Sequence, residues 1–217
     1  MHTDAAQAVG KVPVDVRGLD VDLLSVVGHK LYAPKGVGAL YVRRGVMLEP
    51  VSRGGDHERG IRPGTENVAS IVGFGTACAI ARRDLERESA RVRLLRDRLW
   101  SRLSEAIPGL ALTGHSTDRL PNTLNVRFPN VSALALLARG DGIAASTGSA
   151  CHAGSEKPSA VLLGMGISPE QALGAVRLSL GRETTEEDID RAAAILVDAW
   201  RRTAHHPMSR AQRIAAS

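Results

Sequence analysis

Two side chains stand where their residue types favour chemistry over packing. Cys151 lies in STGSACHA, a run of small residues that gives little reason for burial. A lone cysteine is more often a small core residue, which suits Cys78 in FGTACAIA. Arg177 alternates with Val176 and Leu178, so it belongs to a half-buried strand, where an arginine needs an acidic or carboxylate partner. These patterns weaken the core interpretation for Cys151 and leave Arg177 in need of an acidic or carboxylate partner, with a surface salt bridge as the alternative.

Asp4 and Lys30 are less telling when each is taken alone. Asp4 lies in HTDAAQAVGK and Lys30 in GHKLYAPK. An aspartate near a strand end is more often a cap or a surface charge, and a lysine after Gly-His can be an ordinary surface lysine. The combination with other segments carries the information. Those segments read GGDHERGIRPGTEN (54–67), LPNTLNVRF (120–128), STGSACHA (146–153) and VRLSLGRETT (176–185).

In this order, the six segments resemble the pyridoxal-phosphate cysteine desulfurases and the related selenocysteine lyases of the class V aminotransferase family. The resemblance runs from His2 to about Ala199. It implies an α/β fold: the C-terminal portion of a PLP fold-type-I large domain over residues 1–85, followed by a small α+β domain over 86–205 that carries the cysteine loop. Residues 206–217 are expected to form a tail.

The resemblance also implies cofactor contacts. Lys30 would form the internal aldimine with pyridoxal 5'-phosphate, and Asp4 would pair with the pyridinium nitrogen, keeping the ring able to accept electrons. Gln7 would donate to the phenolic oxygen, and His29 would contact the phosphate or another part of the cofactor. Thr65, in RPGTEN, would reach the phosphate bound by the neighbouring subunit, so the active unit would be a homodimer.

The same resemblance implies the reaction. Cys151 would attack the sulfur of L-cysteine and become a persulfide, and Arg177 would hold the substrate carboxylate. The products would be L-alanine and sulfur passed to an acceptor protein. The alternatives are a selenocysteine lyase acting on L-selenocysteine, and a catalytically incompetent fragment or partner subunit. The fragment reading is motivated by length, since family members are nearly twice as long and the match begins just before Asp4. Val27 also departs from the Ser or Thr that many desulfurases carry there.

The helices, strands and loops that must position these residues are predicted from the spacing of apolar residues and from the positions of glycine and proline. Apolar runs predict strands over 21–27 and 38–42, and glycines and prolines predict a loop over 54–64. A helical pattern runs from Thr65 to Ile107. The other predicted elements are strands at 124–128, 143–147 and 176–180, a helix over 133–138, a capped helix starting at Ser168-Pro169, and a last helix that starts at Thr185 and buries Ile189, Ala192, Ile195 and Trp200.

Composition limits the remaining function classes. The chain has 217 residues, 43% of them hydrophobic, enough for one ordinary domain or two small ones. The net charge of +5 is concentrated in residues 82–102, where eight arginines face four acids on a predicted amphipathic helix, so we expect a solvated face and no nucleic-acid partner. We expect no membrane span, no signal peptide and therefore a cytoplasmic protein. Two cysteines exclude a disulfide scaffold, and no ligand spacing suggests a metal.

Overall fold

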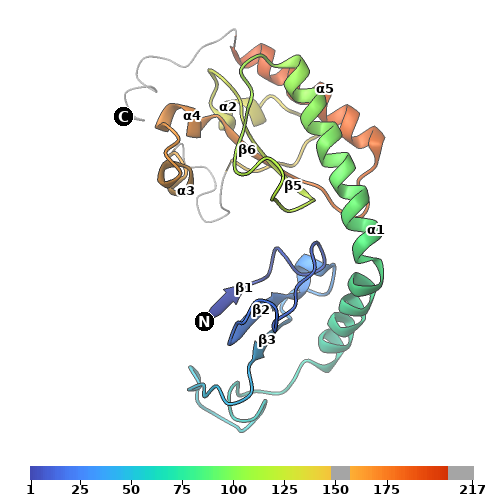
Figure 1. The fold of residues 1–217 in the computed structure, drawn as a ribbon, viewed down its shortest axis with the longest axis vertical. Helices are drawn as coiled ribbons and strands as arrows, with labels where there is room; N and C mark the ends of the chain where they lie inside the picture. Colours follow the sequence, from blue (N-terminus) through green and yellow to red (C-terminus); the bar gives the residue numbers. More distant parts are fainter. Residues whose placement is uncertain (148–156, 205–217) are drawn as a thin grey trace. The chain divides into compact units, whose positions relative to one another are not determined.

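A computed structural model describes residues 1–147 and 157–204 of the chain as a mixed α/β structure (Figure 1). The chain divides into two compact units, Met1–Glu88 and Ser89–Ser217. The boundary falls within one long helix, α1 (Val68–Ala106). Each unit has its own three-stranded sheet. In the part of the chain described, no helix combines the length and the apolar character that crossing a membrane requires.

The sheet of the first unit has the order β1-β2-β3. β1 (His2–Asp4) runs parallel to β2 (Leu23–Val27), and β3 (Gly38–Val42) runs antiparallel to β2. A short 3-10 helix, η1 (Gly28–Leu31), follows β2 directly. Both strands predicted from the apolar runs are therefore confirmed, although the first begins two residues later than predicted.

The first half of α1 packs against η1. Leu31, Phe74 and Ala77 form one buried cluster, and a second small cluster consists of Ala5, Val21 and Leu24. Asn67 caps the helix, because its Oδ1 accepts from the Ser70 amide at 3.1 Å. Other apolar side chains of this half of α1 remain exposed: Val68, Ile71 and Val72. The predicted long helix over 65–107 is confirmed, although it begins at Val68, three residues later than predicted, and ends at Ala106.

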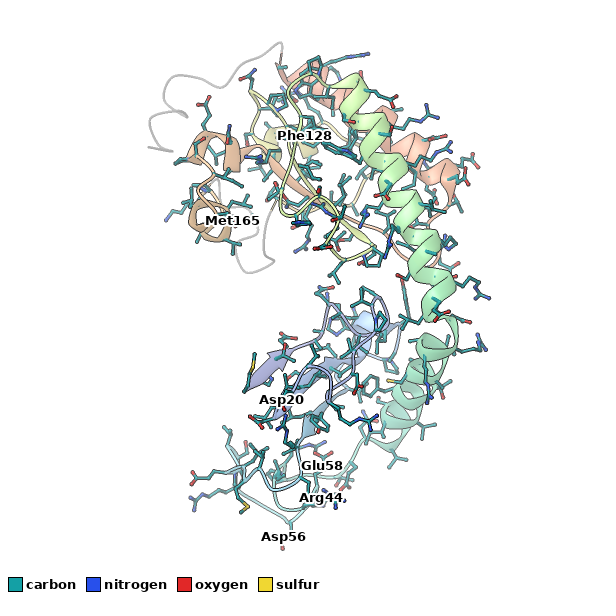
Figure 2. The ribbon with its side chains drawn as sticks, viewed as in Figure 1. Asp20, Arg44, Asp56, Glu58, Phe128 and Met165 are labelled. Carbon is teal, nitrogen blue, oxygen red and sulfur yellow. The ribbon has the colours of Figure 1, made fainter. Side chains whose placement is uncertain are left out.

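The second unit has the sheet order β4-β5-β6, all antiparallel. β4 (Ala111–Leu112), β5 (Thr123–Arg127) and β6 (Ala175–Ser179) pack one face against α5 (Glu186–Ala204) and the second half of α1. Phe128, labelled in Figure 2, directly follows β5 and is buried. The core is continuous and apolar: Leu99, Leu103, Ile107, Leu124, Val126, Leu136, Val176 and Leu196 are all at most 2% exposed.

Three short helices complete the second unit: α2 (Ala133–Leu137), α3 (Ala160–Gly164) and α4 (Pro169–Leu173). Ser132 caps α2, and Ser168 caps α4 by accepting from the Gln171 amide at 3.3 Å. Met165, labelled in Figure 2, follows α3 and is exposed. The predictions of a helix over 133–138 and of a capped helix after Ser168 are confirmed.

The predicted strand over 143–147 is wrong. In this segment only Ser146 forms a bridge, with Arg177 of β6. A turn at Gly142, with φ of +90°, precedes the segment, and two alanines follow Ile143 and provide little side chain for packing across a sheet. The ladder is therefore limited to one residue pair.

Two burial predictions also need correction. The buried stripe of α5 consists of Ile189, Ala193, Leu196, Ala199 and Thr203, so Ala192, Ile195 and Trp200 are only partly buried. Arg96 lies among the arginines predicted to be solvated but is 5% exposed. Its guanidinium donates to the Leu120 carbonyl at 2.9 Å and to Asp97 at 2.7 Å, which satisfies the buried charge.

Candidate active site

Asp4 and Lys30 lie at the carboxyl ends of neighbouring parallel strands. Asp4 is the last residue of β1 and pairs with Ser25 of β2, whereas Lys30 lies in η1, directly after the end of β2. Because parallel strands end at the same edge of a sheet, both residues belong to the carboxyl edge, where open α/β sheets bind their ligands. Both side chains are exposed. The Asp4 carboxylate accepts from the Ala6 amide at 2.9 Å, which orients it at the start of the following turn.

Glycines make the turn that carries Lys30 possible. A Cβ on Gly28 would lie 2.7 Å from the Val37 carbonyl oxygen, and one on Gly38 would lie 2.6 Å from that of Val26. The Gly28 amide donates to the Val37 carbonyl at 2.9 Å, closing the loop between β2 and β3. Tyr32 ends η1 in the left-handed region, with φ of 65°. The chain thus reverses immediately after Lys30, and the lysine stays at the sheet edge.

Lys11 is a cationic neighbour of Lys30. Its Nζ donates to the Lys30 backbone carbonyl at 3.3 Å. Burial, and secondarily the positive charge of Lys30, lower the pKa of Lys11 below its ordinary value of 10.5. The positively charged side chains of Lys11 and Lys30 therefore lie near one another beside the end of β2.

The other predicted cofactor contacts are distributed within the first unit. His29 precedes Lys30 in η1, and Gln7 lies in the turn that follows Asp4; both are exposed. Thr65 is exposed in the segment before α1. In that segment Arg62 donates to the Gly64 carbonyl at 3.0 Å, and the Gly64 amide donates to Nδ1 of His57 at 3.3 Å. Within the described residues, no hydrogen bond joins Thr65 to the sheet edge of its own chain.

Arg177 lies in the middle of β6, in the second unit. Val176 and Leu178 on either side of it are buried, whereas Arg177 and Ser179 are exposed, so the predicted half-buried strand is confirmed. Among the residues that the structure describes, no acidic side chain forms an ion pair with Arg177. The surface ion pair, which was the alternative for Arg177, is therefore not seen among these residues, and its predicted pairing with a substrate carboxylate stays a prediction.

Of the two cysteines, the structure describes Cys78 and not Cys151. Cys151 lies outside the described residues, so its predicted role stays a prediction. Cys78 is a free thiol on α1 that packs beside Leu31 and Phe74. Burial raises the pKa of the Cys78 thiol above its ordinary value of 9.0. This environment makes Cys78 a weak nucleophile at neutral pH.

Two residues near the predicted site were not singled out from the sequence. Lys11 contacts the Lys30 backbone although nineteen positions separate them. Asn125 lies opposite Arg177 in the register of β5 and β6. Both stand inside the segments that indicated the family, HTDAAQAVGK and LPNTLNVRF. Their positions depend on strand pairing, which no local pattern shows.

Comparison with known proteins shows the family to which this chain belongs. The family model for class V aminotransferases matches residues 1–192, and the chain belongs to that family. It is 52% identical over 197 residues to a cysteine desulfurase of Gluconacetobacter diazotrophicus, covering 90% of this chain and 49% of the relative. It is 51% identical to the cysteine desulfurase NifS of Azotobacter vinelandii, covering 88% of this chain and 48% of the relative.

Solved structures agree with the sequence relatives. A NifS-like protein matches 91% of this chain and 51% of its own, with a TM-score of 0.81 and 37% identity. A NifS-like protein from Rickettsia africae matches 92% and 53%, with a TM-score of 0.83 and 29% identity. The α/β fold predicted from the resemblance is confirmed. The chain spans about half the length of the relatives that it matches.

Pyridoxal 5'-phosphate is the cofactor of this family, and the residues of the first unit suit it chemically. An exposed lysine amine, a carboxylate, an imidazole and an amide lie on β1, on η1 and in the turn after β1. An amine can bind the aldehyde carbon, a carboxylate can hold the ring nitrogen protonated, and the imidazole and amide can donate hydrogen bonds to oxygens. Gly28 and Gly38 keep the backbone compact at this edge. The donor set therefore fits the group.

Proposed function

We propose that this chain provides the lysine-bearing part of a pyridoxal-phosphate-dependent cysteine desulfurase. The observation that carries the proposal is the placement of Asp4, at the end of β1, and Lys30, just after β2, at one edge of one sheet. Similarity to cysteine desulfurases over 90% of the chain supports the same activity. The cofactor, when bound, withdraws electrons from the substrate and weakens its bonds at the α and β carbons.

The roles of the chain's own residues follow from their chemistry. The Lys30 amine binds the cofactor covalently and moves protons at the substrate carbons. The Asp4 carboxylate keeps the ring nitrogen protonated, while Gln7 and His29 orient the cofactor. Thr65 contacts the cofactor of a partner subunit in a homodimer.

Cys151 and Arg177 have the proposed roles in the transfer of sulfur. Arg177 holds the carboxylate of L-cysteine with two N–H donors. The Cys151 thiolate attacks the substrate sulfur, so an S–S bond forms while the C–S bond breaks. The released electron pair stays with the β carbon, which takes up a proton and becomes the methyl group of L-alanine. The terminal sulfur of the Cys151 persulfide is then passed to an acceptor protein.

Cofactor capture by Lys30 tests the proposal. The purified chain is mixed with pyridoxal phosphate, desalted, and compared by absorbance with Lys30→Ala. We expect a visible band in the wild type that survives desalting and is absent from Lys30→Ala. Lys35→Ala is the matched control, since Lys35 is an exposed lysine of the same loop, and it should retain the band. A band that Lys30→Ala leaves unchanged would contradict the proposal.

Sulfur transfer is tested at the two cysteines. The loaded chain is incubated with L-cysteine and analysed by intact mass, where a persulfide adds one sulfur atom. We expect this addition in Cys78→Ser and its loss in Cys151→Ser, because burial disfavours the Cys78 thiolate. Sulfur found on Cys78 instead would show that the assignment of the nucleophile is wrong.

A further inference from the structure

One row of polar residues crosses the sheet of the second unit. The Thr113 amide donates to the Asn125 carbonyl at 2.9 Å, and Asn125 pairs with Arg177 in the register of β5 and β6. On its other side, the Arg177 amide donates to the Ser146 carbonyl at 2.8 Å, and the Ser146 amide donates back at 3.2 Å. Residues directly opposite one another in antiparallel strands project from the same face. Asn125 and Arg177 are therefore neighbours on one face.

This face is the one turned away from the apolar core. Leu124 and Val126 on β5, and Val176 and Leu178 on β6, are buried in that core. Because side chains alternate along a strand, Asn125 and Arg177 lie on the opposite face. The backbone of Arg177 is held from both sides, by β5 and by Ser146, so its Cα has a fixed position at the sheet.

Among the residues that the structure describes, two buried side-chain oxygens in this row have no hydrogen-bond partner. They are Oδ1 of Asn125 and Oγ1 of Thr113. Leaving a buried acceptor unpaired is unfavourable, so such an atom usually has a purpose or a missing partner. Arg177, directly opposite Asn125, is exposed and forms no ion pair with the described residues. The unpaired Oδ1 of Asn125 and the guanidinium of Arg177 thus belong to directly opposite residues on one face of the sheet.

Arg127 is another arginine on this face, and its Nε is also buried without a hydrogen-bond partner, so it does not donate to Oδ1 of Asn125 in this structure. Arg127, two residues after Asn125, donates through Nη1 to Oε1 of Gln171 at 3.1 Å and through Nη2 to the Leu112 carbonyl at 3.4 Å. Its guanidinium is therefore held toward α4 and β4. Arg177 lies directly opposite Asn125 in the register, and its guanidinium is therefore the second group that could supply a donor to this oxygen.

We infer that Asn125 is a positioning residue for Arg177: its side-chain oxygen accepts one guanidinium N–H when the two outer donors of Arg177 hold a substrate carboxylate. A guanidinium has five N–H donors and a bidentate carboxylate uses two, so three remain for the protein. The inference rests on the proposed function, which makes Arg177 the carboxylate-binding residue. It adds a residue that fixes the direction of the Arg177 fork before the carboxylate arrives.

The test measures carboxylate binding at Arg177 without requiring turnover. Propionate is titrated into the ¹⁵N-labelled full chain, and the Nε–Hε signal of Arg177 is followed by NMR after assignment through its loss in Arg177→Lys. We expect propionate to shift this signal, and Asn125→Ala to bind propionate at least about fivefold more weakly. Thr123→Ala is the matched control, because Thr123 lies on the same face of β5 but pairs with Ser179, and it should bind like the wild type.

Asn125→Thr guards against a folding defect. Threonine suits a strand, and its short hydroxyl is not expected to reach the guanidinium, so this variant should bind as weakly as Asn125→Ala. If propionate does not shift the Arg177 signal in the wild type, the carboxylate role of Arg177 fails, and this inference fails with it. If Asn125→Ala or a folded Asn125→Thr binds as tightly as the wild type, the positioning role alone is wrong. In that case the oxygen serves another partner, such as a buried water.

Discussion

At the scale of single residues, Gly28 shows how backbone space determines where Lys30 lies. The Val37 carbonyl approaches so closely that a methyl group would overlap it. We expect Gly28→Ala to destabilise the first unit by about 1–3 kcal/mol, the usual cost of overpacking, and to reduce cofactor capture by Lys30. Urea unfolding followed by circular dichroism, together with the absorbance assay, measures both effects.

Gly75→Ala is the matched control for that substitution. Gly75 lies within α1, and a Cβ there would meet no atom within 4 Å. Alanine favours a helix over glycine by about 1 kcal/mol, so this variant should be slightly more stable than the wild type and should capture the cofactor normally. If both variants behaved alike, the close approach at Gly28 would not be what holds the turn.

At the scale of elements, the start of α5 depends on a reciprocal cap. Oγ1 of Thr185 accepts from the Asp188 amide at 3.1 Å, and the Thr185 amide donates to Oδ2 of Asp188 at 3.1 Å. Hydrogen bonds from Thr185 hold the pKa of Asp188 below its ordinary value of 3.8. We expect Thr185→Ala to lower the free energy of unfolding by about 1 kcal/mol at pH 7, measured by urea denaturation.

The same cap predicts a pH dependence. A carboxyl group whose pKa is lower in the folded protein stabilises the fold fully above its unfolded pKa. That stabilisation is lost as the pH falls below about 4 and through the folded pKa of Asp188. The stability difference between the wild type and Asp188→Asn should therefore shrink with acidification in this range. A constant difference between pH 6 and pH 3 would contradict the role of the Asp188 charge.

The elements also show what local sequence can and cannot predict. The strand at 38–42, the long helix and the cap at Thr185 were predictable, because apolar periodicity and capping residues act locally. The segment 143–147 was not, since its alanines carry no strong preference and its pairing depends on Arg177. For the candidate site, the sequence motifs predicted the residue types and positions, such as Asp4, Lys30 and Arg177. The pairing of Asn125 with Arg177 needed the register of two strands that are far apart in sequence.

At the scale of the whole molecule, the two units differ in the size of their cores. The second unit has one large continuous cluster of buried apolar residues beside a small cluster of three, whereas the buried clusters of the first unit have three residues each. We expect the first unit to unfold at lower denaturant concentration. Both tryptophans, Trp100 and Trp200, belong to the second unit, so their fluorescence should change after the first loss of circular dichroism.

Hydrogen exchange read by mass spectrometry identifies which unit opens first. Peptides from β1, β2 and β3 should exchange faster than peptides from β5 and β6, because a smaller buried apolar area supports less local stability. Coincident fluorescence and circular dichroism transitions, with equal protection of both sheets, would show that the chain unfolds as one cooperative unit.

The continuity of α1 across the boundary at Glu88 also governs how the protein can be divided in the laboratory. Val92, Leu95 and Leu99 of α1 belong to the core of the second unit, while Phe74 and Ala77 pack in the first. A cut at Ser89 would leave each piece with an open helix end and new charged termini beside its core. Each unit, if expressed alone, should therefore include several further turns of α1. In those added turns, the apolar residues that pack in the core of the absent unit should be replaced with polar ones.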